Sequence, residues 1–144
     1  MDGEHIRTSV VFFCHDGNGK YLLNKRSQNC RDEQGTWDPG GGSVEFGERL
    51  VDAVMREIQE EFCTTPKDIE FMGYRDVMRE QNGKKTHWVS HDFRVLVDPK
   101  EVRSGEPHKC DGLTWVTIAE LENFPEPLHS QFPIFLKQYR DKLI

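Results

Sequence analysis

The sequence predicts an α+β fold, layered as an α/β/α sandwich around a mixed β-sheet. Two observations support this prediction. Runs of β-branched and aromatic residues occur in pairs separated by Gly/Asn turns, and two segments, in the middle of the chain and at its end, carry apolar residues at helical spacing. The chain has 144 residues, 35% of them hydrophobic and 31% charged. This length and composition suit a single globular domain over residues 1–144.

The first third of the chain is expected to form a hairpin and a glycine-rich turn. Residues 7–16 and 21–26 read as two strands, because "DGNG" between them is typical of a hairpin turn. The polar residues 27–37 read as a loop. The segment "DPGGG" (38–42) is expected to lie outside helix and strand interiors and to form a flexible turn.

The rest of the chain is expected to supply a helix, a long hairpin, a late strand and two C-terminal helices. Apolar residues recur every three or four positions over 48–62, which predicts a helix that "TTP" then stops. Residues 69–80 and 85–98 flank "QNGK" and predict the long hairpin. A loop over 99–112, a strand over 113–118, a short helix over 119–124 and an amphipathic helix within 127–143 complete the order. That last helix is expected to begin after Pro127 or at Pro133.

The helix over 48–62 carries an unusual group of carboxylates. At about 100° per residue, Glu57, Glu60 and Glu61 share a narrow arc beside the apolar stripe. Like charges one turn apart repel each other, whereas Mg²⁺ or Mn²⁺ would make the same group favourable. A solvated glutamate-rich helix is the alternative. The glycine segment in front of the helix favours a ligand, because a backbone without side chains can approach one closely.

These residues resemble a known motif. The segment is similar to the Nudix box, Gly-x5-Glu-x7-Arg-Glu-U-x-Glu-Glu-x-Gly-U, in which U is aliphatic. The matching positions are Gly42, Glu48, Arg56, Glu57, Ile58, Glu60 and Glu61. The chain departs from the motif at Cys63, in place of the last glycine, and at Thr64, in place of the last aliphatic residue; Pro39-Gly40 also departs from the usual lead-in. None of these departures removes a charged position.

The resemblance implies a metal-dependent hydrolase of nucleoside diphosphates linked to another group. It implies that Glu57, Glu60, Glu61 and the main-chain oxygen of Gly41 hold Mg²⁺ or Mn²⁺, and that Arg56 orients Glu57. It leaves two roles open for Glu48, which either binds the metal or interacts favourably with the helix dipole from the first turn.

The general base is also open. Glu60 is one candidate, and the loop after the long hairpin offers Glu106 and Asp111. Asp111 is placed where MutT-type members carry a loop carboxylate, so we predict it as catalytic with Glu57, Glu60 and Arg56. An ordinary Asp-Gly turn is the alternative for Asp111.

The resemblance favours one substrate class within the family. The chain lacks the Pro and Tyr that ADP-ribose and diadenosine polyphosphate hydrolases often carry beyond the box, and it looks more like MutT-type members. We therefore expect a nucleoside triphosphate to be cleaved to the monophosphate and pyrophosphate. An ADP-ribose or nucleotide-sugar diphosphatase is the alternative, followed by a non-catalytic nucleotide-binding module. Arg26, Trp88, His91 and Phe93 are candidates for the base or phosphate pocket, with ordinary packing as the alternative for each.

The net charge and cysteine pattern limit the partners. A net charge of -6 argues against a nucleic acid polymer as partner, so a small nucleotide is expected. The sequence has no signal peptide and no apolar run of membrane-spanning length, so no membrane partner is expected. Four scattered cysteines without a Cys-x-x-Cys pair favour reduced thiols and a cytoplasmic location. Homodimer formation is left open by the sequence.

Overall fold

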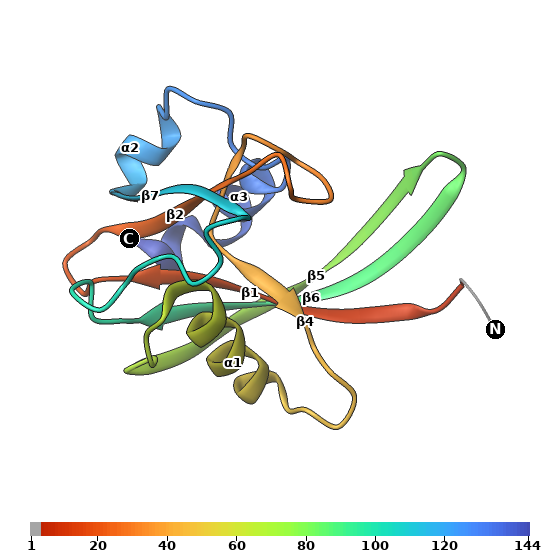
Figure 1. The fold of residues 1–144 in the computed structure, drawn as a ribbon, viewed down its shortest axis with the longest axis horizontal. Coiled ribbons are helices and arrows are strands. Elements are labelled where there is room, and N and C mark those ends of the chain that lie inside the picture. The colour runs from red at the N-terminus through yellow and green to blue at the C-terminus, as the bar shows by residue number, and fades with distance from the viewer. Residues whose placement is uncertain (1–3) are drawn as a thin grey trace.

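The computed structural model describes residues 4–144 and arranges them as strands between helices (Figure 1). In chain order, the elements are β1 (Ile6–His15), β2 (Tyr21–Arg26), β3 (Trp37–Asp38), β4 (Gly41–Ser43), α1 (Leu50–Phe62), β5 (Asp68–Gln81), β6 (Lys84–Leu96), β7 (Cys110–Val116), α2 (Ile118–Glu122) and α3 (Phe132–Leu143). The elements therefore follow the order that the sequence predicts, with two additional short strands, β3 and β4.

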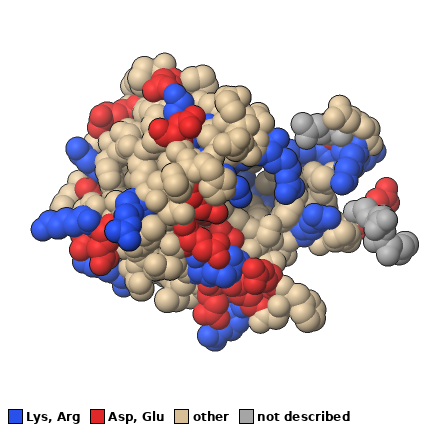
Figure 2. Space-filling view, in the orientation of Figure 1, with Lys and Arg blue, Asp and Glu red and all other residues tan. Residues whose placement is uncertain are grey.

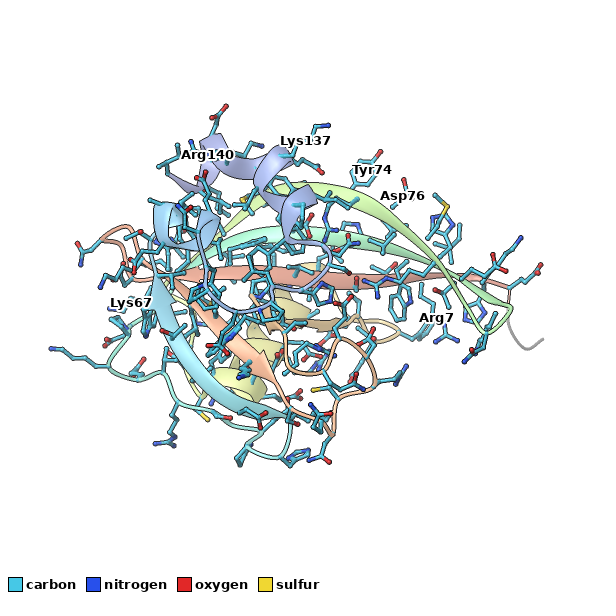
Figure 3. The ribbon with its side chains drawn as sticks, turned by 90° about the horizontal axis from the view of Figure 1, so that it is seen from above. Arg7, Lys67, Tyr74, Asp76, Lys137 and Arg140 are labelled. Carbon is cyan, nitrogen blue, oxygen red and sulfur yellow. The ribbon has the colours of Figure 1, made fainter. Side chains whose placement is uncertain are left out.

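The strands form one mixed sheet of seven strands, in the order β3-β2-β1-β6-β5, with β4 paired to β1 and β7 paired to β2. The β1–β6 pair is parallel and the others are antiparallel. Side chains alternate along β1, so Phe12 packs toward α1 and Phe13 packs toward α3. Figure 3 shows these two helices on opposite sides of the strands, which confirms the predicted α/β/α sandwich.

Of the two expected hairpins, the long one is present, whereas the strands of the first one barely pair with each other. Strands β5 and β6 pair from Asp68↔Leu96 to Gln81↔Lys84, which confirms the long hairpin, and its tip extends away from the rest of the molecule (Figure 1). By contrast, β1 and β2 pair only at His15↔Tyr21. Strand β1 pairs along its length with β6 instead, and β2 pairs with β7.

The expectation of a flexible glycine turn is wrong. Gly41 and Gly42 lie in β4 and pair with Val11 and Val10 of β1. Glycine weakens a strand but is used where another group approaches its backbone closely. Such a group is present here, because a Cβ at Gly42 would overlap the carboxyl group of Glu57.

The two main helices begin and end close to the predicted positions. Helix α1 ends at Phe62, and Cys63 takes the left-handed conformation (φ 58°) that the motif's glycine would adopt, with its N–H bonded to the Gln59 carbonyl. Helix α3 begins at Phe132, with Pro133 in its first turn, where a proline needs no N–H partner.

Among residues 4–144, no helix is long and apolar enough to cross a bilayer. Cys14, Cys30, Cys63 and Cys110 are free thiols. The cellular compartment and the assembly state stay predictions.

Candidate active site at the acidic edge of α1

Arg56 is the centre of an ion-pair network on α1. Its guanidinium binds Glu48 through two hydrogen bonds of 2.7 and 2.9 Å and donates a third, of 2.9 Å, to Glu57. Its distance to Glu60 is longer, at 3.5 Å. Hydrogen bonds from Arg56 lower the pKa of Glu48 to about 2, so this carboxylate stays ionised and positions Arg56. Acidic side chains with basic atoms among them gather around α1 in Figure 2.

Strand β4 brings its backbone against this network. Arg56 Nη2 donates to the Ser43 carbonyl at 3.1 Å. Phe12 N donates to the Gly40 carbonyl, and Val44 N donates to the Thr8 carbonyl, so every second residue of this segment faces β1. The Gly41 carbonyl, like that of Ser43, therefore points away from β1, where it is available to a ligand beside Glu57.

Glu61 has a buried carboxyl oxygen without a partner. Its Oε2 atom is inaccessible to solvent and has no hydrogen bond among the described residues. Burial, followed by the negative charges of Asp38, Glu57 and Glu106, raises the pKa of Glu61 well above its usual value. Burial also raises the pKa of Glu57, against the opposing effect of Arg56. Both carboxyl groups thus lack a sufficient positive partner.

The loop between β6 and β7 adds a further carboxylate to this edge. Gly105 N donates to the Glu61 carbonyl at 2.9 Å, and Arg103 N donates to the Phe62 carbonyl at 3.2 Å. Gly105 is needed for this approach, because a Cβ there would overlap the Glu60 carbonyl. The loop places Glu106 close enough to raise the pKa of Glu61.

Asp111 has a different position. It lies in strand β7, not in the loop, and is exposed. The negative charges that raise the pKa of Glu61 are those of Asp38, Glu57 and Glu106. The structure therefore brings Glu106, the alternative loop carboxylate, near the cluster, and the catalytic role of Asp111 stays a prediction. The sequence signal for Glu106 was the glycine directly before it.

The residues at this edge fit a divalent cation in their chemistry. Magnesium and manganese prefer oxygen ligands, and Glu57, Glu60, Glu61 and the Gly41 carbonyl supply only oxygens. The partnerless Oε2 of Glu61 is the observation that favours a cation as a ligand of this edge. As they stand, no three acidic, histidine or cysteine side chains within residues 4–144 are arranged around one point as metal ligands. Arg56 is the cation that balances this edge in the structure.

A cavity of about 720 Å³ opens next to β4. Arg26, Trp88 and Gly41 line it, and the substrate-binding role of Arg26 and Trp88 stays a prediction. Phe93 does not line it, because its position on β6 directs the ring into the buried cluster between the sheet and α1. His91 is likewise absent from the lining, and its ring lies 3.3 Å from the Ser9 carbonyl.

Arg26 links the cavity to the acidic edge. Its guanidinium binds Asp38 at 2.9 Å and Asp32 at 2.9 Å. Asp38 also lines the cavity, and its charge acts on Glu61. No local pattern marks Asp38 as a functional residue, because it lies in the segment "DPGGG" that predicts a turn.

A second buried charged cluster lies on the α3 side of the cavity. Arg75 binds Asp92 through Nε at 2.7 Å and Nη2 at 3.0 Å, and both side chains are buried. Tyr139 donates to Asp92 at 2.5 Å, and Ser90 donates to it at 3.0 Å. Sequence reasoning missed this cluster, because Arg75, Asp92 and Tyr139 lie 17 to 64 positions apart along the chain and follow no local motif.

Comparison with known proteins agrees with this arrangement. The family model described as NUDIX domain matches residues 5–139. A MutT NUDIX hydrolase from Burkholderia pseudomallei is 30% identical, with a TM-score of 0.79 over 94% of this chain and 98% of its own. A MutT protein from Methanosarcina mazei Go1 is 26% identical, with a TM-score of 0.74 over 99% and 97%. The chain belongs to the Nudix family, whose members are pyrophosphohydrolases acting on nucleoside diphosphate derivatives, as the motif predicted.

A curated relative matches a shorter segment. The protein named m7GpppN-mRNA hydrolase NUDT17 from Xenopus laevis is 38% identical over 61 residues, which are 42% of this chain. That match covers 21% of the relative, so the chain spans about a fifth of its length. Its substrate therefore does not transfer to this chain.

Proposed function

We propose that this chain hydrolyses a nucleoside triphosphate to the monophosphate and pyrophosphate, with Mg²⁺ or Mn²⁺ as cofactor. The observation that carries the proposal is the partnerless Glu61 oxygen, which lies in a carboxylate cluster beside a nucleotide-sized cavity. The preference for triphosphates over ADP-ribose or nucleotide sugars rests on the MutT-like sequence features and on the absence of the Pro and Tyr markers.

The residues divide into groups that hold a cation and groups that position them. Glu57, Glu60, Glu61 and the Gly41 carbonyl would hold the cation. When bound, the cation neutralises the polyphosphate and lowers the pKa of the attacking water. Arg56 keeps Glu57 in place and is itself kept in place by Glu48. Glu48 thus serves as a positioning residue in this proposal.

The chemical step is a displacement at phosphorus. The water oxygen bonds to the α-phosphorus, the bond from that phosphorus to the α–β bridging oxygen breaks, and pyrophosphate leaves with the electron pair. The water proton passes to a carboxylate. Glu60, Glu106 and the predicted Asp111 are the candidates, and the effect of the Glu106 charge on Glu61 supports Glu106.

Hydrolysis in ¹⁸O-labelled water tests the proposal. With Mg²⁺ present, we expect the label in the nucleoside monophosphate and none in pyrophosphate. Label in pyrophosphate would contradict attack at the α-phosphorus. Efficient cleavage of ADP-ribose with little action on any triphosphate would contradict the substrate class, and equal turnover in EDTA would contradict the metal requirement.

Variants separate the two loop carboxylates. If Glu106 receives the proton, Glu106→Gln lowers kcat and removes the acidic limb of the pH–rate profile, whereas Asp111→Asn leaves both unchanged. The reverse pattern would restore Asp111 as the base. Loss of that limb in Glu60→Gln alone would assign the role to Glu60.

A further inference from the structure

The two residues that depart from the motif at the end of α1, Cys63 and Thr64, both contact the loop between β6 and β7. Thr64 is only 2% exposed, and its hydroxyl donates to Glu101 Oε1 at 2.9 Å. A Cβ atom at Gly105 would lie 3.1 Å from Cys63 Sγ, so the thiol packs directly against this glycine. The aliphatic residue of the motif would have no hydroxyl to donate at position 64. The departure therefore gives this chain a polar contact with the loop.

The loop runs antiparallel to the residues that end α1. Two backbone hydrogen bonds join these segments: Arg103 N donates to the Phe62 carbonyl at 3.2 Å, and Gly105 N donates to the Glu61 carbonyl at 2.9 Å. The bond from Thr64 to Glu101 continues the same series in the opposite direction along the loop. Among the described residues, it is the one hydrogen bond between these segments that depends on side chains.

This series of contacts ends directly before Glu106. The charge of Glu106 raises the pKa of Glu61, so the loop brings this carboxylate to the acidic edge. Val102 anchors the loop by packing against the buried cluster between the sheet and α1. Glu101 is exposed, so burial does not fix its side chain, and the Thr64 hydroxyl does. The path of the loop toward Glu106 therefore begins at a contact that Thr64 supplies.

We propose that Thr64, by holding Glu101, positions Glu106 for the reaction at the acidic edge. The inference rests on the proposed function in one respect, namely that Glu106 receives the proton of the attacking water. A proton acceptor contributes only within hydrogen-bond reach of that water, and a displacement of about 1 Å slows such a step markedly. Thr64 does not line the cavity and is not one of the proposed cation ligands, so it is a positioning residue.

Two substitutions of Thr64 separate positioning from stability. Thr64→Val keeps the shape of the side chain and supplies the aliphatic residue of the motif, but it removes the hydroxyl. Its kcat should fall about tenfold with KM nearly unchanged, and it should stay folded. Thr64→Ser keeps the hydroxyl and loses a buried methyl group, so it should be less stable yet retain most of the wild-type kcat. Steady-state kinetics with a panel of nucleoside triphosphates and Mg²⁺, together with thermal melts, measure both properties.

Amide hydrogen exchange follows the loop without turnover. In Thr64→Val, the backbone N–H groups of Arg103 and Gly105 should exchange about tenfold faster, because the loop opens more often. In Thr64→Ser they should exchange at the wild-type rate. Thr65→Val is the matched control, since Thr65 is the next residue and is exposed. It should change neither the exchange rates nor kcat.

A double variant tests whether Thr64 acts through Glu106. In a Glu106→Gln background, Thr64→Val should lower kcat no further, because the group that it positions is already absent. An equal further loss in that background would overturn the inference. So would activity that follows stability, with Thr64→Ser losing more kcat than Thr64→Val.

The exchange rates separate this inference from the proposed function. Unchanged exchange in Thr64→Val would overturn the inference, and triphosphate hydrolysis would still stand. Conversely, faster exchange in Thr64→Val alone, in a protein that hydrolyses no triphosphate, would support the positioning of the loop by Thr64 and contradict the proposed reaction.

Discussion

The Arg75–Asp92 pair near α3 and Glu61 of α1 both have buried carboxylate oxygens, but the bonding of these oxygens differs. Asp92 accepts from Arg75, Ser90 and Tyr139, so its two oxygens have four hydrogen bonds. Glu61 has a buried oxygen with no partner and carboxylates around it. Burying charge is costly unless it is paired. The first cluster is complete within the chain, whereas we propose that a divalent cation completes the second.

This difference distinguishes a structural cluster from a ligand site. The groups that complete Asp92 come from β5, β6 and α3, so the cluster links that helix to the sheet. The groups near Glu61 are mostly negative, so they oppose folding slightly and favour a cation. We therefore expect changes in the first cluster to act on stability and changes in the second to act on activity.

The largest expected effect on stability follows from Asp92→Ala. It leaves Arg75 buried without its counter-charge, and breaking a buried pair in this way costs about 3–5 kcal/mol of unfolding free energy. Urea unfolding measures the change. Asp76→Ala is the control, because Asp76 is an exposed residue of β5 (Figure 3) and should change stability by less than about 0.5 kcal/mol. Equal losses in the two variants would contradict the distinction.

The corresponding effect on activity follows from Glu57→Gln. The change keeps the side-chain volume and removes a charge that would hold the cation, so kcat/KM should fall about 100-fold or more while the protein stays folded. Initial rates with Mg²⁺ and a thermal melt measure both properties. Glu70→Gln, at an exposed position of β5, should keep the wild-type rate. A Glu57→Gln variant that retains more than half of that rate would show that Glu57 is not a ligand.

A smaller effect on stability is expected from Tyr139→Phe. It removes one hydrogen bond to Asp92 but leaves the Arg75 pair, so the loss should be about 1 kcal/mol. Tyr74→Phe is the control, since the Tyr74 side chain is exposed and should contribute little. If Tyr139→Phe were as costly as Asp92→Ala, the hydroxyl group and not the ion pair would hold the cluster together.

The sequence predicted the two regions unequally, for physical reasons. Local periodicity identified α1, and the motif spacing placed Glu57, Glu60 and Glu61 on one edge, because helix geometry makes near neighbours in sequence near neighbours in space. The Arg75–Asp92 cluster depends on strand pairing and on Tyr139, 64 positions after Arg75, which no local pattern encodes.

The glycine segment was misread for a related reason. The freedom of Gly41 and Gly42 suggested a turn, but their lack of side chains serves the close packing of β4 against Glu57. The position of Asp111 before a strand favoured it as the base, and no local pattern indicated the contact of Gly105 with the end of α1, which brings Glu106 to the same edge. In both cases the missing information was which segment packs against the glycine.

The pH dependence of the metal-free protein follows from Glu61. Its folded-state pKa is raised above the unfolded value, so the protonated form favours the folded state. The unfolding free energy should therefore be highest below the unfolded pKa and should fall as pH rises through the raised pKa of Glu61. Urea unfolding in EDTA across this range measures the slope, and Glu61→Gln, which cannot titrate, should flatten it.

Thermal melts of Glu61→Gln and of the wild-type protein at pH 7.5, with and without Mg²⁺, are the most direct test of whether a cation completes the acidic edge. Without metal, we expect the variant to be more stable than wild type by about 1 kcal/mol, or roughly 3 °C, because its amide is neutral and donates to Glu57. With Mg²⁺, wild type should gain stability and the variant should gain much less. A less stable metal-free variant, or an equal gain from Mg²⁺ in both proteins, would contradict the claim that the acidic edge is completed by a cation.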